Sequence, residues 1–407
     1  MIKAHKIKLN PTKSQEKLLR QSCGVARFAF NWALNKWKED YKAGIKQSAY
    51  SLIKHLNSIK RIEYPWMQET SKTCSQYAIH NVEAAFKKMW KEKSGYPKFK
   101  KKGIKDSFVA VENKEQFKQK DKKIRLPRIG WVKCYENLRF DGKVNNVTVK
   151  RIADMWFAII NIEVSQSIPA LKQSLGDNQA IVGIDFGIKE MMVLSDGTVF
   201  SNPKSLRGNL KGLKKLQKRL SRKTKGSSNR RKMQMRVARK YYRISNIRKN
   251  AIHQATTAIV KKFDVIVIET LNPMGMAKNR KLSQAVSDVS FGEISRQFSY
   301  KAQWAGKELI KADKWFASSK ICSCCGNKKE QLSLSERIYR CENCGLEIDR
   351  DLNAAKNLAN LGTTQKSWES QACGGRSSVV AKAQLSCPMN QEIENNIKCS
   401  KKKNINY

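Results

Sequence analysis

Residues 180–187, with the sequence AIVGIDFG, indicate the fold of this chain most directly. They combine a short apolar run, typical of a buried strand, with an acid, Asp185, and a glycine turn. Two further short apolar runs with turn residues follow at 190–197 and 198–203, so we predict a meander of three strands. Desolvating a carboxylate in such a strand costs several kcal/mol unless a cation or a hydrogen-bond donor compensates it. Taken alone, Asp185 is more often a turn or capping residue than a catalytic one.

Two other stretches carry an acid in a comparable setting. Residues 263–270, FDVIVIET, have the pattern of a second buried strand and end close to Glu269. In residues 348–362, IDRDLNAAKNLANLG, Asp351 lies in helical register with the apolar positions four and seven residues later. Its carboxylate therefore continues the apolar stripe of a helix toward the sheet. The alternative role of Asp351 is that of a helix N-cap, and the two roles are compatible.

Three carboxylates that converge on one point repel one another and favour hard divalent cations, whose preferred ligands are carboxylate oxygens and water. We predict that Asp185, Glu269 and Asp351 bind two Mg²⁺ ions roughly 3.5–4 Å apart. Asp185 would bridge the ions, and Glu269 and Asp351 would complete the two coordination shells. Such a pair activates a water molecule and stabilises the leaving oxygen of a phosphodiester. The predicted reaction is metal-assisted hydrolysis.

A four-cysteine motif lies between the second and third acids. Cys322 and Cys325 are followed, after fifteen residues, by Cys341 and Cys344, which is the spacing of a zinc ribbon with four thiolate ligands. A site of this kind is closed, so the zinc is expected to fold the ribbon and not to take part in chemistry. Cys324 is an extra thiol that could compete for the metal, but it does not repeat the two-residue gap. The other six cysteines are predicted to be buried or idle thiols.

The chain is strongly basic. Its 407 residues include 81 Lys and Arg against 34 Asp and Glu, a formal net charge of +47 at pH 7. A globule with this imbalance repels itself unless a polyanion neutralises it, and nucleic acid is the polyanion we expect. The chain has no run of about 18 apolar residues and its first residues have no apolar signal core, so we predict a cytoplasmic protein. Eleven cysteines, an odd number, argue against a full disulfide framework.

Residues 204–249 hold nineteen Lys or Arg and no Asp or Glu. Leucines at positions 206, 210, 213, 216 and 220 form one apolar stripe, and a second stripe follows a GSSN turn. This pattern predicts a hairpin of two helices, apolar on one side and basic elsewhere. A charge run is often a solvated face, but a run of a single sign gains nothing from alternating ion pairs, so we favour contact with phosphates.

The N-terminal third divides into a helical part and a β part. Residues 10–95 are predicted to be helical, beginning with a helix start at Thr12 and Gln15, and residues 96–168 carry near-alternating strands. The opening residues alternate too and are interpreted as the first strand of this β domain. Aromatic residues among the lysines of the helices are expected mainly to fill the core, with base stacking as the alternative; they are Phe28, Phe30, Trp32, Trp37 and Trp90.

In this order, the segments GIDFG, IETLNPMGM, FGEISRQFSYKAQWAGK, SSKICSCCG, YRCENCG and DRDLNAAKNLA closely resemble the TnpB (OrfB) family of transposon-associated RNA-guided DNA nucleases. The resemblance spans most of residues 1–375. It implies a multidomain α/β protein with a RuvC-like RNase H fold split by a zinc ribbon, and a helical recognition domain inserted in a β-barrel wedge domain. It also implies a guide RNA transcribed from the transposon end. The family cuts guide-matched double-stranded DNA beside a short transposon-adjacent motif and is thought ancestral to type V CRISPR effectors.

The resemblance assigns the RuvC acids to Asp185, Glu269 and Asp351, and the zinc ligands to Cys322, Cys325, Cys341 and Cys344. It implies a bacterial or archaeal, nucleoid-associated protein. The predicted domains are a wedge domain (1–9 and 96–168), a recognition domain (10–95), a nuclease domain (169–317 and 346–376), a zinc ribbon (318–345) and a C-terminal tail (377–407).

This sequence departs from the family pattern at a few positions, none of which is a catalytic acid; they are Asn250, Thr270, Pro273 and Ala317. Two other functions are alternatives to the nuclease. A non-cleaving RNA-guided repressor would be favoured if one of the acids were missing, and all three are present. A strand-transferring transposase could use the same fold and the same metals, and would join a DNA 3′ end to its target.

Overall fold

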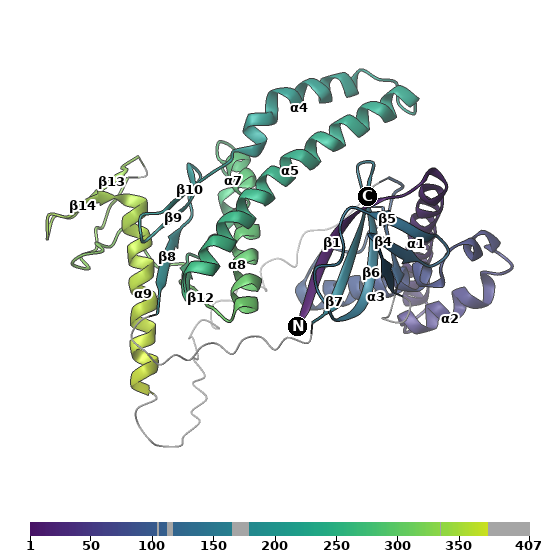
Figure 1. Cartoon of the computed structure of the whole chain (residues 1–407), viewed down its shortest axis with the longest axis horizontal. Coiled ribbons are helices and arrows are strands. Elements are labelled where there is room, and N and C mark those ends of the chain that lie inside the picture. The colour runs from purple at the N-terminus through teal and green to yellow at the C-terminus, as the bar shows by residue number, and fades with distance from the viewer. Residues whose placement is uncertain (104–105, 112–116, 165–178, 334, 373–407) are drawn as a thin grey trace, which may run out of the picture. The chain divides into compact units, whose positions relative to one another are not determined.

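The computed structural model describes residues 1–103, 106–111, 117–164, 179–333 and 335–372 (Figure 1). The chain divides into two compact units, residues 1–362 and 363–407. Apart from the last residues of one helix, all the elements below belong to the first unit. The tail predicted at 377–407 lies outside the described residues, as do three of the idle cysteines, Cys373, Cys387 and Cys399. In the described part, no helix has the length and apolar character needed to cross a membrane.

An antiparallel sheet of seven strands begins the chain, in the order β2-β6-β7-β1-β5-β4-β3. Its strands are β1 (Ile2–Asn10), β2 (Ser107–Val111), β3 (Lys118–Lys120), β4 (Lys123–Leu126), β5 (Gly130–Cys134), β6 (Lys143–Ile152) and β7 (Met155–Glu163). The opening residues pair along the whole of β7, from Ile2 opposite Glu163 to Leu9 opposite Trp156. The prediction that they form the first strand of the β domain is confirmed.

The predicted barrel is not closed in the described residues, because β2 and β3 end the strand order and do not pair with each other. The edge strand β3 has only three residues, Lys-Gln-Lys, of which both lysines are exposed. Short, charged edge strands discourage further pairing, which accounts for an open edge at this point.

Helices fill the interval between β1 and β2. They are α1 (Lys13–Lys42), α2 (Ala49–Ile59), the 3₁₀ helix η1 (Pro65–Glu69) and α3 (Lys72–Glu92). The predicted start of α1 is confirmed: Thr12 Oγ1 accepts from the Gln15 N–H at 3.3 Å, and Gln15 Oε1 accepts from the Thr12 N–H at 3.1 Å. These helices and the sheet share one apolar core.

The aromatic residues of these helices divide between the two predicted roles. Phe30 and Trp37 are buried in the shared core, as expected for core residues. Phe28 and Trp32 are only partly buried, and Trp90 is 57% exposed. The rings of Phe28, Trp32 and Trp90 therefore retain surface that a ligand can reach.

The second sheet has five strands in the order β10-β9-β8-β11-β12. They are β8 (Ile181–Asp185), β9 (Glu190–Leu194), β10 (Val199–Ser201), β11 (Val265–Ile268) and β12 (Glu308–Lys311). Strands β8, β11 and β12 are parallel, whereas β9 pairs antiparallel with β8, and β10 pairs antiparallel with β9. The predicted three-strand meander is confirmed.

Helices α4 (Ser205–Ser221) and α5 (Ser228–Lys262) form the predicted basic hairpin (Figure 1). Leu213 on α4 and Met233 and Ile244 on α5 are buried, while most of the basic side chains are exposed. The remaining elements are α6 (Pro273–Met276), α7 (Ser283–Val289), α8 (Phe291–Ala305), the hairpin β13 (Ile338–Arg340) and β14 (Glu347–Asp349), and α9 (Arg350–Ala372).

The buried carboxylate of Asp288 on α7 caps the basic hairpin. It accepts hydrogen bonds from the Ser205 hydroxyl at 2.8 Å and the Leu206 N–H at 2.9 Å, and it pairs with Arg248 of α5 at 3.0 Å. Burial opposes ionisation of Asp288, but these donors outweigh it and lower its pKa. One side chain thus holds the start of α4 to α5 and α7.

We expect Asp288→Ala to destabilise the protein by about 3 kcal/mol, because it leaves Arg248 without its buried partner. Thermal unfolding followed by circular dichroism at pH 7 should show a midpoint several degrees lower than that of the wild type. Because the pKa of Asp288 is lowered, its stabilising effect is complete above about pH 4 and is lost as the pH falls toward the lowered value. The difference between the two proteins should therefore shrink in acid, and a difference that grows there would contradict the assignment.

Gly183, in the middle of β8, lets α9 pack directly on the sheet. A Cβ atom added to it would lie 2.0 Å from the Ala355 carbonyl oxygen and 2.4 Å from the Ala359 nitrogen. Both are backbone atoms of α9, so neither can move aside without shifting the helix. On the same face, Leu358 of α9 packs with Val265 and Val267 of β11.

We expect Gly183→Ala to cost at least about 3 kcal/mol, because overpacking against backbone is poorly relieved. The matched control is Gly208→Ala in α4, where nothing lies within 4 Å of the added Cβ and alanine favours the helix. Chemical denaturation of the two variants should show a large loss for the first and none for the second. Equal stability of both would refute the close approach of α9.

Candidate active site and metal centre

Two of the predicted acids emerge at the same edge of the second sheet. The register of the parallel pair places Ile184 of β8 opposite Ile268 of β11. Asp185 and Glu269 are the next residues of these two segments, so both side chains lie at the carboxyl ends of neighbouring strands. Glu269 is fixed there because its Oε1 accepts a hydrogen bond from the Phe186 N–H at 2.9 Å. Ligands of open α/β sheets bind at this edge.

The third acid, Asp351, lies in the first turn of α9 and is half-buried. The cap of this helix is Asp349, whose Oδ1 accepts from the N–H groups of Asp351 at 2.9 Å and of Leu352 at 3.1 Å. Of the two roles considered for Asp351, capping therefore belongs to Asp349. The Asp351 carboxylate instead approaches the arginine before it, Arg350, at 3.3 Å.

The charges of the three acids influence one another. Burial and the nearby carboxylates of Glu269 and Asp351 raise the pKa of Asp185 well above its usual range, although Arg350 opposes the shift. Burial and, to a smaller extent, Asp351 raise the pKa of Glu269 to about 7, against the hydrogen bond from Phe186. Mutual repulsion in a poorly solvated site produces such shifts, and a bound cation would reverse them.

The three carboxylates are neighbours, but they do not form a closed ligand cage. Within the described part of the chain, only the four cysteines form a group of at least three potential metal ligands whose atoms all lie within 4.8 Å of one another. In this arrangement Asp351 is held by Arg350 and lies 4.0 Å from Arg337.

Arg337 and Arg350 are the site residues that the sequence analysis missed. Both are within 4.0 Å of the Asp351 carboxylate, and Arg350 is the more enclosed of the two. Guanidinium groups beside an acid cluster suit the phosphate of a nucleic acid, which they contact with two parallel hydrogen bonds. The signal for Arg350 was its position between the two aspartates of DRD. Nothing in the sequence marks Arg337.

The four predicted zinc ligands are gathered in one cluster. The Sγ atoms of Cys322 and Cys344 are 3.6 Å apart, and those of Cys325 and Cys341 are 3.5 Å apart. A glycine with positive φ follows each pair of cysteines. Gly326, after Cys325, has a φ of 75°, and Gly345, after Cys344, has a φ of 71°. Four thiols at these separations fit tetrahedral coordination of a zinc ion, so the donor set suits the predicted metal.

The other described cysteines also behave as predicted. Cys324 is exposed and is not a member of the cluster. Cys23, Cys74 and Cys134 are buried thiols. Burial raises the pKa of Cys23 and of Cys74 to about 12, so both are protonated and unreactive at neutral pH.

Two buried asparagines of α9 fasten the cysteine cluster to the helix that carries Asp351. Asn353 donates to the Ile321 carbonyl at 2.7 Å and accepts from the Ser323 N–H at 3.0 Å. Asn357 donates to the carbonyls of Ser318 at 2.8 Å and Ile321 at 2.6 Å. The order of the ribbon is therefore coupled to the position of the third acid.

A search of solved structures finds the same fold. The chain in "Cryo-EM structure of the Cas12f1-sgRNA-target DNA complex" matches this one with a TM-score of 0.56 at 15% identity, over 88% of this chain and 99% of that chain. The likeness defines the class of protein, a mixed α/β chain with the Cas12f1-like fold.

Family models match three segments of the chain. "Probable transposase" (OrfB_IS605) matches residues 160–280, "Cas12f1-like, TNB domain" matches 291–358, and "Helix-turn-helix domain" (HTH_OrfB_IS605) matches 1–46. In the structure, the last of these segments forms β1 and α1.

Two curated relatives match almost the whole length. "Putative RNA-guided DNA endonuclease InsQ" of Escherichia coli strain K12 is 31% identical over 381 residues, which cover 89% of this chain and 92% of that protein. A "Putative RNA-guided DNA endonuclease" of Streptomyces pristinaespiralis is 32% identical over 382 residues and 91% of each chain. The chain belongs to the TnpB (OrfB) family. The resemblance predicted from its motifs is confirmed.

Proposed function

We propose that this protein is an RNA-guided DNA endonuclease. Its catalytic site, formed by Asp185, Glu269 and Asp351, would hydrolyse phosphodiester bonds. The observation that carries the proposal is the gathering of these acids, from three separate segments, at the carboxyl edge of the second sheet. The raised pKa values of Asp185 and Glu269 support it, because perturbed carboxylates cluster at functional sites. The names of the two curated relatives support the same activity.

The three acids would hold Mg²⁺. The residues present fit this ion, since carboxylate oxygens are its preferred protein ligands and repulsion among them favours a cation. When bound, a pair of such ions supplies an activated water and stabilises the leaving oxygen. Asp185 would be the principal ligand, the Phe186 N–H orients Glu269 for the same task, and Arg350, which lies beside Asp351, would contact the scissile phosphate.

We assign the rest of the chain to binding and positioning. The exposed basic residues of the α4–α5 hairpin suit the phosphates of RNA or DNA. The cysteine cluster would bind one structural zinc, inside a ribbon at 318–345 that divides a RuvC-like nuclease domain at 169–317 and 346–376. The remaining segments would be a wedge domain at 1–9 and 96–168, and a recognition domain at 10–95.

The proposed partners are a guide RNA transcribed from the transposon end and double-stranded DNA that matches it beside a short transposon-adjacent motif. The Cas12f1 chain of similar fold is described in a complex with "sgRNA" and "target DNA", which supports both kinds of partner. The test is to sequence the RNA that copurifies with the expressed protein and then supply Mg²⁺ and plasmid DNA matching that RNA. We expect double-strand breaks in the matched plasmid only. Breaks that ignore the guide sequence would refute the proposal.

A strand-transferring transposase is the second candidate, because the matched family model is described as "Probable transposase". The same acids would then catalyse the joining of a DNA 3′ end to a target. The plasmid assay separates the two functions, since strand transfer yields joined products and hydrolysis yields free ends.

A further inference from the structure

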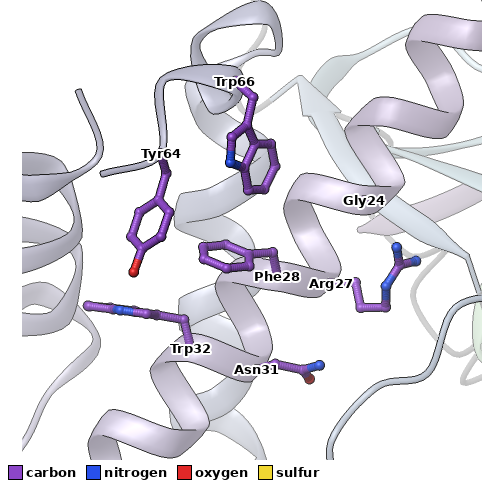
Figure 2. A pocket seen from close by; sticks show the side chains of 7 residues that line it. All are labelled: Gly24, Arg27, Phe28, Asn31, Trp32, Tyr64 and Trp66. Atoms are coloured by element: carbon purple, nitrogen blue, oxygen red, sulfur yellow. The ribbon is translucent and has the colours of Figure 1, made fainter. Parts of the chain in front are cut away.

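An aromatic cavity of about 600 Å³ opens between α1 and the segment that leads into η1. Figure 2 shows its four rings turned toward one another, with Arg27 and Asn31 on the other side of Phe28. The Phe28 ring lies 4.8 Å from that of Tyr64 and 5.1 Å from that of Trp66, both edge to face. The fourth ring is that of Trp32.

These rings do more than cover the core. Phe28, Trp32 and Tyr64 each pack against the N-terminal core with one part of the ring and line the cavity with another. Trp66 is 44% exposed, an unusual loss of hydrophobic burial for the largest side chain. A set of half-open rings around one cavity is the form of a stacking site for a planar ligand.

A basic groove of about 610 Å³ adjoins the aromatic cavity and shares Gly24 and Arg27 with it. Six basic side chains line the groove, against two acidic ones, Glu16 and Asp106. Each acid forms an ion pair with an arginine: Glu16 pairs with Arg20, and Asp106 pairs with Arg27. The groove is therefore positive overall. The other basic residues are Lys13, Lys17, Lys102 and Arg151.

Arg151, on β6, carries an orphaned donor in this groove. Its buried Nε atom has no hydrogen-bond partner among the described residues. Buried donors are normally paired, so the described residues leave this guanidinium group short of one acceptor. Phosphate oxygens are the acceptors that match a guanidinium group.

The amide of Asn31 and the guanidinium group of Arg27, which both line the aromatic cavity, are already engaged. Asn31 donates to the Lys100 carbonyl at 3.0 Å and accepts from the Lys100 N–H at 2.8 Å, so both ends of its amide are used. Arg27 faces Asp106 at 3.6 Å. The lining therefore offers ring faces in preference to hydrogen bonds that read a base edge, and stacking of this kind tolerates any base.

We propose that the aromatic cavity binds one unstacked base of a single DNA strand whose phosphates lie in the adjoining basic groove. The proposal rests on the proposed function, because pairing of a guide with its target displaces one DNA strand. The sequence of that strand changes with every target, so a site that tolerates all bases suits it better than it suits an RNA of fixed sequence. A positively charged groove and aromatic rings on which bases stack are the usual elements of a site that binds single-stranded nucleic acid.

Two variants test the site in the purified ribonucleoprotein, with cleavage blocked by Asp185→Ala in every sample. Trp66→Ala removes the most exposed ring. Gly24→Leu is designed to fill the shared rim, where an added Cβ meets only the flexible Arg27 guanidinium, at 3.8 Å. The matched control is Trp90→Ala, which removes an exposed tryptophan of the same helical region that does not line the cavity.

Affinity is measured for guide-matched duplex DNA and for the matched target strand alone, which has no displaced partner. We expect Trp66→Ala and Gly24→Leu to weaken duplex binding about five- to a hundredfold and to leave binding of the single target strand unchanged. Trp90→Ala should change neither. Unchanged duplex affinity, or an equal loss with both DNAs, would overturn the proposal, and a loss of copurified guide RNA would assign the cavity to RNA. A wild-type particle that ignores guide matching would instead refute the proposed function itself.

Discussion

Replacing Asp185 by alanine is expected to lower the rate of guide-matched DNA cleavage by about a thousandfold or more. Burial and the neighbouring carboxylates of Glu269 and Asp351 raise the pKa of Asp185 well above its usual range, so Asp185 interacts with both other acids of the proposed site. Losing it would remove one of the proposed magnesium ligands, and single catalytic residues typically account for effects of this size. The measurement is the rate of linearisation of a matched plasmid by the ribonucleoprotein in Mg²⁺.

The control for this prediction is Asp196→Ala. Asp196 lies in the turn between β9 and β10 and pairs at 2.7 Å with Lys262, which precedes β11 and so lies at the opposite end of the sheet. A partly exposed pair of this kind contributes at most about 1 kcal/mol, and its loss should leave the cleavage rate unchanged. Guide and target binding should survive in both variants. Cleavage that persists in Asp185→Ala would show that the catalytic assignment is wrong.

Removing one of the four proposed zinc ligands should have the second largest effect. We expect Cys322→Ser to abolish stoichiometric zinc binding, because a structural site of four thiolates rarely tolerates the loss of one, and zinc binding supplies on the order of 10 kcal/mol of folding free energy to such modules. Zinc content by atomic absorption should fall from one ion per chain to a small fraction. Limited proteolysis should then cut within residues 318–345.

Cleavage should also fall in Cys322→Ser, although a structural zinc would take no direct part in the reaction. The reason lies in Asn353 and Asn357, which bind the backbone at Ser318 and Ile321 and so couple the ribbon to the helix that carries Asp351. The matched control is Cys324→Ser, since Cys324 is exposed and lies outside the cluster. That variant should keep both its zinc and its activity. Loss of zinc in Cys324→Ser, or full zinc in Cys322→Ser, would contradict the ligand assignment.

Much of the local structure was predictable from short patterns. The helix start at Thr12 and Gln15, the meander after Asp185 and the basic hairpin all follow from the spacing of neighbouring residues. The cysteine cluster was predictable for the same reason, because each pair of ligands lies within one tight turn. The open edge of the first sheet could not be predicted in this way, because closure of a barrel depends on whether its two edge strands meet. In the described residues the edge strand β3 is short and charged, and it does not pair with β2.

The residues of the proposed site could be selected from the sequence, but their arrangement could not. The acids could be selected because each interrupts an apolar pattern. The segments that carry them do not indicate, however, which strands are neighbours in the sheet. Only the path of the chain from β14 into α9 shows that Asp349 caps the helix. The Asp351 carboxylate is therefore available to pair with Arg350. Arg337 approaches Asp351 from the β13 side of the ribbon, a contact between segments with no shared periodicity.

The sequence by itself determined the family, the basic character, the candidate acids and the four thiols, because periodicity, charge and ligand spacing are properties of the local chain. Only the tertiary structure decided that β8 lies beside β11 in a register that aligns Ile184 with Ile268, and that Gly183 admits α9 to the sheet. Strand neighbours and helix packing depend on the fit of surfaces far apart in the chain. Through them, acids from three separate segments come to share one edge.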